Sequence, residues 1–97
     1  MINHIVLWNF KPELSEADKK EAGETLKKEL CSLKDKIDGI LAIDVVINEL
    51  ETSNREIALI SSFESVEALN AYVVHPEHVK VGGFVKSVTC DRACLDY

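Results

Sequence analysis

The segment 71–84, AYVVHPEHVKVGGF, holds the residues of this chain that are best suited to acid–base chemistry. It contains Tyr72 and two of the three histidines, His75 and His78. A histidine titrates near neutral pH, so His78 can accept a proton at little cost. The Tyr72 phenol can donate a hydrogen bond to an oxygen that becomes negatively charged. Proton abstraction beside a carbonyl group requires such a base and such a donor together.

A structural interpretation of the same residues stays open. His78 can cap a helix end, and Tyr72 can belong to the core with its hydroxyl satisfied. On a continuing helix His75 would lie about 110° from the apolar side, so we expect it to be exposed. The two histidines could share a metal only if both faced inward, and Pro76 interrupts the helix between them. We therefore expect neither a metal site nor a cofactor.

Small residues suggest where a ligand pocket could lie. The first half of the first expected helix has only Ala22 and Gly23 near its inner side. Gly23 costs roughly 1 kcal/mol of helix propensity relative to alanine, and it leaves space between helix and sheet. Either Trp8 or a ligand is expected to fill that space. Trp8 is large for a pocket wall, so we expect the cavity to be small.

Composition narrows the class of protein. At 97 residues, 46% of them hydrophobic, the chain is expected to form a single domain over residues 1–97. Its net charge of −6 argues against nucleic acid as a partner, because affinity for phosphates comes from clustered cations. The sequence shows neither an apolar stretch of membrane-spanning length nor a signal-peptide pattern. We therefore expect no membrane partner and a cytoplasmic location.

The cysteines do not indicate a disulfide framework. The chain has three of them, Cys31, Cys90 and Cys94, which is an odd number for a short chain. Cys90 and Cys94 lie four residues apart in an expected strand, so they would point to the same face of the sheet. We interpret them as small buried residues rather than reactive thiols.

Apolar periodicity predicts the first half of the element order. The segment 2–10 reads as a strand that is apolar on both faces in its middle, which is typical of a central strand. Ser15 is expected to cap a helix over 16–37, whose apolar residues recur every three or four positions. Two further strands, 40–48 and 56–64, are joined by a polar turn and form a predicted hairpin.

The second half of the chain is expected to contain a broken helix. Ser65 can cap a helix that ends before Pro76, because a proline restricts the residue that precedes it. Pro76 can then begin a second, short helical turn, which Gly82 and Gly83 are expected to close. The segment 86–97 is the last predicted strand.

The resulting order, β-α-β-β-α-β, is the ferredoxin-like pattern of an α+β protein. It places two helices on one face of a four-stranded antiparallel sheet. Strand 2–10 nevertheless carries Ile5 and Leu7 on its second face, and strand 40–48 is apolar on both faces. A second apolar face needs a partner, and a second copy of the chain in a two-fold homodimer is the simplest one.

Three segments resemble a known family: INHIVLWNF at the start, FESVEALNAYVVHPEH after the third strand, and CLDY at the end. The chain resembles the stress-responsive dimeric α/β-barrel (Dabb) domains from end to end, most specifically in Y..HP.H with a histidine in the first strand. The resemblance implies a ferredoxin-like monomer that pairs into a dimeric α/β barrel.

The resemblance also implies residue roles. Some plant relatives are polyketide cyclases that use no cofactor and take a histidine and a tyrosine as acid and base. Those roles would fall on His78 and Tyr72, with His4 lining the same pocket. The size of Trp8 argues against a long polyketide substrate. Our candidate ligand-binding residues are His4, Val6, Trp8 and Gly23.

Three functional hypotheses follow. The leading one is a homodimeric domain that binds a small hydrophobic or enolisable carbonyl ligand, with cofactor-independent acid–base chemistry of the cyclase or isomerase type. The first alternative is a structural or stress-linked dimer without turnover. The second is a cofactorless monooxygenase, which would need a substrate activated by deprotonation. A pocket lined jointly by His4, Tyr72 and His78 would favour the leading hypothesis over the first alternative.

Overall fold

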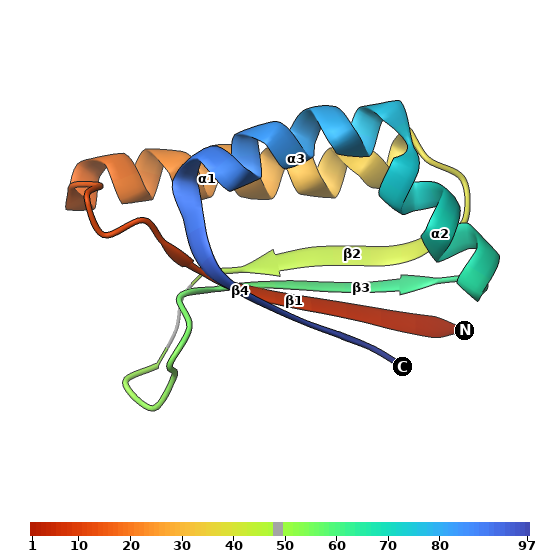
Figure 1. The fold of residues 1–97 in the computed structure, drawn as a ribbon, viewed down its shortest axis with the longest axis horizontal. Helices are drawn as coiled ribbons and strands as arrows, with labels where there is room; N and C mark the ends of the chain where they lie inside the picture. Colours follow the sequence, from red (N-terminus) through yellow and green to blue (C-terminus); the bar gives the residue numbers. More distant parts are fainter. Residues whose placement is uncertain (48–49) are drawn as a thin grey trace.

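The computed structural model describes residues 1–47 and 50–97, and its strands form one antiparallel sheet of four. The strands are β1 (Ile2–Phe10), β2 (Ile40–Val46), β3 (Ile57–Phe63) and β4 (Thr89–Asp96), in the order β2-β3-β1-β4. The helices are α1 (Glu16–Ser32), the 3₁₀-helix η1 (Leu33–Asp35), α2 (Val66–Val74) and α3 (Pro76–Val88). Figure 1 shows the α-helices on one face of the sheet. The predicted ferredoxin-like fold is confirmed.

β1 is the central strand that its sequence predicted. It pairs antiparallel with β3 on one side and with β4 on the other. One set of alternating β1 side chains faces the helices and is buried, namely His4, Val6, Trp8 and Phe10. The hairpin of β2 and β3 is also confirmed, although Asn48 and Glu49, at the predicted end of the strand and start of the turn, lie outside the described residues.

α1 begins where the sequence predicted and ends earlier. The Ser15 side chain accepts a hydrogen bond from the backbone N–H of Asp18, at 3.1 Å, and so caps the helix. The α-helix ends at Ser32 and continues only as η1, short of the predicted end at residue 37. Gly39 follows in the left-handed region with φ of +92°, where a Cβ would also lie 2.8 Å from Cβ of Ala68. No helix in the described part of the chain is long and apolar enough to cross a membrane.

The predicted helix break is confirmed, but the predicted end of the second helix is wrong. α2 ends at Val74, and Pro76 is the first residue of α3. α3 then runs through Gly82 and Gly83 to Val88, so β4 begins three residues later than expected. Two helical glycines cost only about 1 kcal/mol each, and the buried face of α3 on either side of them outweighs that cost.

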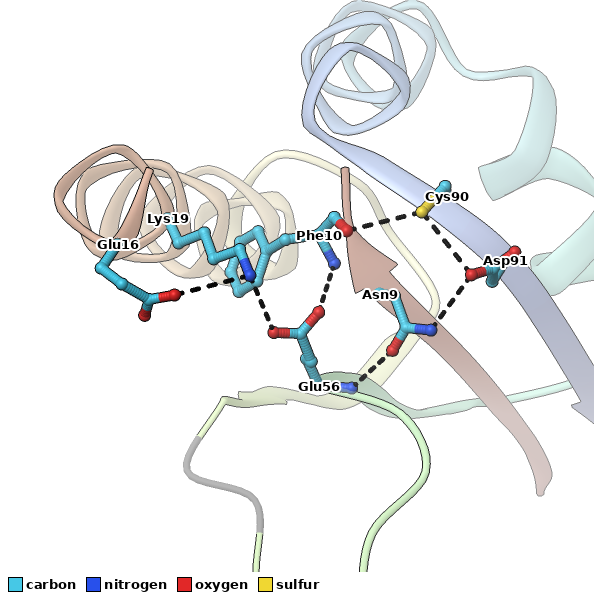
Figure 2. A network of polar contacts seen from close by, with 7 residues as sticks. All are labelled: Asn9, Phe10, Glu16, Lys19, Glu56, Cys90 and Asp91. Carbon is cyan, nitrogen blue, oxygen red and sulfur yellow. Dashed lines mark hydrogen bonds and ion pairs between the residues drawn. The ribbon is translucent and has the colours of Figure 1, made fainter. Parts of the chain in front are cut away.

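β4 contains a bulge. Ala93 pairs with Leu7 and Cys90 pairs with Asn9, so two β4 residues stand where β1 has one. Asp91 occupies the extra position with a left-handed φ of 55°, and its carboxylate accepts a hydrogen bond from the side-chain N–H of Asn9 at 3.1 Å (Figure 2). The bulge overturns the prediction that Cys90 and Cys94 share a face.

None of the three cysteines is fully buried. Cys94 is exposed, and Cys31 and Cys90 are partly buried. All three are free thiols, as the odd count indicated, but the expectation of small core residues is wrong. Cys94 is exposed because β4 lies at the open edge of the sheet.

Candidate functional site

A cavity of about 650 Å³ lies between the helices and the inner face of the sheet. Its volume falls within the range of about 300–1,000 Å³ that is usual for ligand pockets. Trp8 forms part of the wall without filling the space, so the expectation of a small cavity is wrong. The lining residues are His4, Val6, Trp8, Leu30, Leu59, Tyr72, Val73, His78, Val79, Gly82, Gly83, Val85, Lys86 and Arg92. His4, Tyr72 and His78 therefore meet in one cavity.

The helix break sets the position and tautomer of His78. In an unbroken helix the carbonyl oxygen of Val73 would accept the N–H of Glu77, but that N–H donates to Nδ1 of His75 at 3.1 Å. The Val73 oxygen instead lies 3.0 Å from Nδ1 of His78. A carbonyl oxygen can only accept, so Nδ1 of His78 carries the hydrogen. In the neutral ring the Nε2 lone pair is then free to accept a proton.

The surroundings of His78 keep its imidazole neutral. Burial lowers the pKa of His78 below its ordinary value of 6.5. The hydrogen bond with Val73 raises this pKa by a smaller amount, while the charges of His4, Arg92 and His75 lower it further. At neutral pH the side chain is therefore a base with a free nitrogen. The same hydrogen bond also caps α2, which gives His78 a structural role and leaves its Nε2 available.

Tyr72 carries a hydroxyl without a partner. Its side chain is completely buried, and among the described residues the hydroxyl oxygen has no hydrogen-bond partner. Burial raises its pKa to about 12, so it stays a protonated donor at neutral pH. The Tyr72 ring contacts the His78 ring in a tilted arrangement, at 4.3 Å between centroids and 42° between planes, and meets the His4 ring edge-on at 6.2 Å. An unmade hydrogen bond costs about 1–3 kcal/mol, and a carbonyl ligand would remove that cost.

His4 is held by a carboxylate. Its Nδ1 is hydrogen-bonded to Oδ1 of Asp96, which lies opposite it on β4. A carboxylate only accepts, so Nδ1 of His4 carries the hydrogen and the ring orientation is fixed. Cys94 lies beside this pair, with its sulfur 3.8 Å from Nδ1. These three side chains bring nitrogen, sulfur and oxygen atoms within 4.8 Å of one another, and they are the described residues that could hold a metal.

The structure differs from the sequence prediction at Gly23 and at His75. Gly23 is buried under β1, where a Cβ would come within 3.1 Å of Ile47 and 3.3 Å of Phe10. These side chains fill the space beside Gly23, and it does not line the cavity. His75 is partly buried rather than exposed, because its ring caps the start of α3.

Sequence reasoning missed three polar residues of the site. Asp96, Lys86 and Arg92 all belong to the segment 86–97, which reads as an ordinary strand. A signal existed for Gly82 and Gly83, since two glycines inside a helix lower its stability without any packing demand. A Cβ at either position would meet no atom within 4 Å, so both face open space.

The match to a family model decides the family. The model for the stress responsive A/B barrel domain (Dabb) matches residues 2–97. The chain belongs to this family. Its sequence is 29% identical over 96 residues to olivetolic acid cyclase from Cannabis sativa, covering 99% of this chain and 94% of that protein.

Solved structures share the fold. A dimeric protein of unknown function with a ferredoxin-like fold, from Bacteroides fragilis, superposes with a TM-score of 0.91 at 31% identity, covering 99% of this chain and 93% of that one. Hydroxynitrile lyase from Passiflora edulis superposes with a TM-score of 0.82 at 15% identity, with coverages of 99% and 90%. The second likeness establishes only the shared fold.

Proposed function

We propose that this protein binds a small enolisable carbonyl compound and catalyses proton transfer beside the carbonyl group. The observation that carries the proposal is the joint position of the neutral His78 and the unpartnered Tyr72 hydroxyl on one cavity. The family and the similarity to olivetolic acid cyclase support it. The name of that relative indicates cyclisation, which we extend to this chain as a proposal only.

The reaction begins with His78. Its Nε2 takes a proton from the carbon beside the carbonyl, and the electron pair of that C–H bond forms the double bond of an enolate. The carbonyl oxygen takes the negative charge and accepts a hydrogen bond from Tyr72. The imidazolium returns the proton to another atom, which completes an isomerisation. If the enolate carbon first attacks a second carbonyl, a ring closes.

Hydrogen–deuterium exchange tests the proposal without knowledge of the natural substrate. We expect the protein to speed the loss of the proton NMR signals beside the ketone of 4-oxononanoate or its methyl ester in D₂O. Such protons exchange slowly without a catalyst, so the background is low. Equal rates with and without the protein, under conditions where either compound is bound, would contradict the proposed function.

The two alternatives give different results in the same assay. A structural or stress-linked dimer would exchange no protons, and the capping bond from His78 to Val73 is the observation that favours it. A cofactorless oxygenase would share the deprotonation step but would also consume dissolved oxygen. Exchange without oxygen uptake is the result that we expect.

We also propose that the chain forms a homodimer through the sheet face opposite the helices. Ile5, Leu7 and Ala93 lie on this face, and Ile60 and Leu95 are 46% and 62% exposed there. Burying such a surface is favourable, and the similar structure from Bacteroides fragilis is described as dimeric. Light scattering should show a dimer at micromolar concentration, and Ile60→Lys should shift it to a monomer. A wild-type monomer would refute this assembly.

We also propose that the protein is located in the cytoplasm. Three free thiols suit a reducing compartment. Fractionation of cells that express the tagged full chain would check it.

A further inference from the structure

Two cations border the cavity without an ion-pair partner. Lys86 comes from α3 and Arg92 from β4, and both line the cavity. Both side chains are exposed, and within residues 1–47 and 50–97 neither takes part in a salt bridge. The chain has 17 acidic and 11 basic residues, so carboxylates are plentiful. Among the described residues, the lining of the cavity nevertheless contains both cations and no carboxylate, so an anionic group of a ligand can meet positive charge there.

The bulge in β4 is what directs Arg92 into the cavity. Thr89 pairs with Phe10, a residue that faces the helices. Regular alternation from Thr89 would place residues 91, 93 and 95 on that face and Arg92 on the opposite one. The extra residue, Asp91, shifts the alternation, so Arg92 stands across from Trp8 on the helix-facing side. A left-handed aspartate is uncommon, and here it serves to place this cation.

The charge of Arg92 reaches the proposed catalytic residues. After burial, it is among the causes that lower the pKa of His78. The Asp96 carboxylate, on the same face, is already hydrogen-bonded to His4. The cavity therefore combines a cationic side with the Tyr72 hydroxyl, which needs an acceptor.

We propose that the ligand of this cavity carries a carboxylate that binds Arg92 and Lys86, in addition to the carbonyl group that faces Tyr72 and His78. The inference rests on the proposed function and names its substrate class as small oxo acids. An arginine can bind a carboxylate through two parallel hydrogen bonds, and a lysine adds a second point charge. The largely apolar remainder of the cavity wall, with Val6, Leu30 and Leu59, fits an alkyl chain.

Paired probes test this inference by calorimetry or NMR titration. 4-Oxononanoate should bind the full chain roughly tenfold more tightly than its methyl ester, the preference expected for charge-assisted hydrogen bonds to an arginine and a lysine. Arg92→Gln should remove most of that preference, and Lys86→Gln should reduce it. The affinity of both variants for the ester should change much less than their affinity for the acid. Lys80→Gln is the matched control, because Lys80 is exposed on α3 and does not line the cavity.

Several results would overturn the inference. The first is equal affinity of the wild type for acid and ester. The second is no detectable binding of the acid. The third is an equal loss of affinity for both compounds in Arg92→Gln. Its failure is separable from that of the proposed function. Acid-selective binding without proton exchange would refute only the chemistry. Equally fast exchange of bound acid and bound ester, with equal affinities, would refute only the carboxylate preference.

Discussion

Two polar regions beside β1 differ in how completely their groups are satisfied. Near its C-terminal end, the Glu56 carboxylate accepts the backbone N–H of Phe10 at 3.0 Å and lies 3.7 Å from the Lys19 ammonium (Figure 2). The backbone N–H of Glu56 donates to the side-chain oxygen of Asn9 at 3.1 Å. Each of these groups has a partner within the chain.

Around the cavity, groups of the same kinds lack partners. The Tyr72 hydroxyl is buried without an acceptor, and Lys86 and Arg92 form no ion pair among the described residues. The Glu56 network joins strand ends and a helix, so its role is structural. The cavity groups stabilise nothing that the described chain contains. The difference teaches that a buried unsatisfied polar group such as the Tyr72 hydroxyl, rather than polar groups in general, marks the site at which a ligand is expected.

The largest effect should come from His78→Ala. Loss of an acid–base group should slow proton exchange of bound 4-oxononanoate by about 10²–10⁴-fold. His75→Ala is the matched control, because it too removes a histidine that satisfies a helix end, at a cost of about 0.5–2 kcal/mol in stability. Both variants should have a lower melting temperature than the wild type, but only His78→Ala should lose proton exchange. Equal loss of exchange in both would mean that the helix break, and not the base, matters.

Next in size is the effect of Glu56→Ala on folding. It leaves the Phe10 N–H without its acceptor, so the free energy of unfolding should fall by about 1–3 kcal/mol in urea titrations. The exchange rate of folded protein should not change. Glu51→Ala, at an exposed position outside the network, should leave stability unaltered. A loss of exchange in folded Glu56→Ala would show that the two regions are coupled.

A smaller effect concerns pH. The folded pKa of His78 lies below 6.5, so exchange should persist at pH 6.5 and fall as the pH drops through that folded pKa. The unfolded chain binds this proton at higher pH than the native chain does. The contribution of His78 to stability is therefore complete above about pH 6.5 and declines on acidification. The NMR chemical shifts of the His78 ring should follow its titration. If the exchange rate fell to half its maximum already above pH 7, the lowered pKa of His78 would be contradicted.

The smallest expected effect is that of Gly82→Ala. Alanine should stabilise α3 by up to about 1 kcal/mol, because a Cβ there meets no atom within 4 Å. The same Cβ enters space that borders the cavity, so the affinity for 4-oxononanoate should fall. Gly39→Ala should instead lower the melting temperature, since its φ is +92° and Ala68 lies too close. Unchanged affinity in Gly82→Ala would place the ligand away from α3.

The sequence predicted those parts of the fold that depend on strong local signals. Pro76 determined the helix break, Ser15 and Ser65 determined two helix starts, and the doubly apolar strand 2–10 indicated a central position. The pairing of Tyr72 and His78 in the site also came from one short segment.

The rest depended on features that local patterns do not reveal. The bulge at Asp91 reverses which residues of β4 face the helices. Aspartate adopts the left-handed conformation more readily than most residues, but the aspartate alone does not mark a bulge inside a strand. Arg92 and Asp96 were missed for that reason. Gly23 appeared to leave a void, but Phe10 and Ile47 fill it from other elements. Cavity volume likewise depends on how several helices pack at once.

Tyr72→Phe tests the central claim most directly, because it removes one oxygen atom and nothing else. If the hydroxyl serves a ligand, the free energy of unfolding should stay the same or rise, since a buried unsatisfied group is lost. The exchange rate of bound 4-oxononanoate should fall by about 10²-fold, the usual cost of removing a donor to a developing oxyanion. A variant that is clearly less stable but exchanges protons at the wild-type rate would contradict this account.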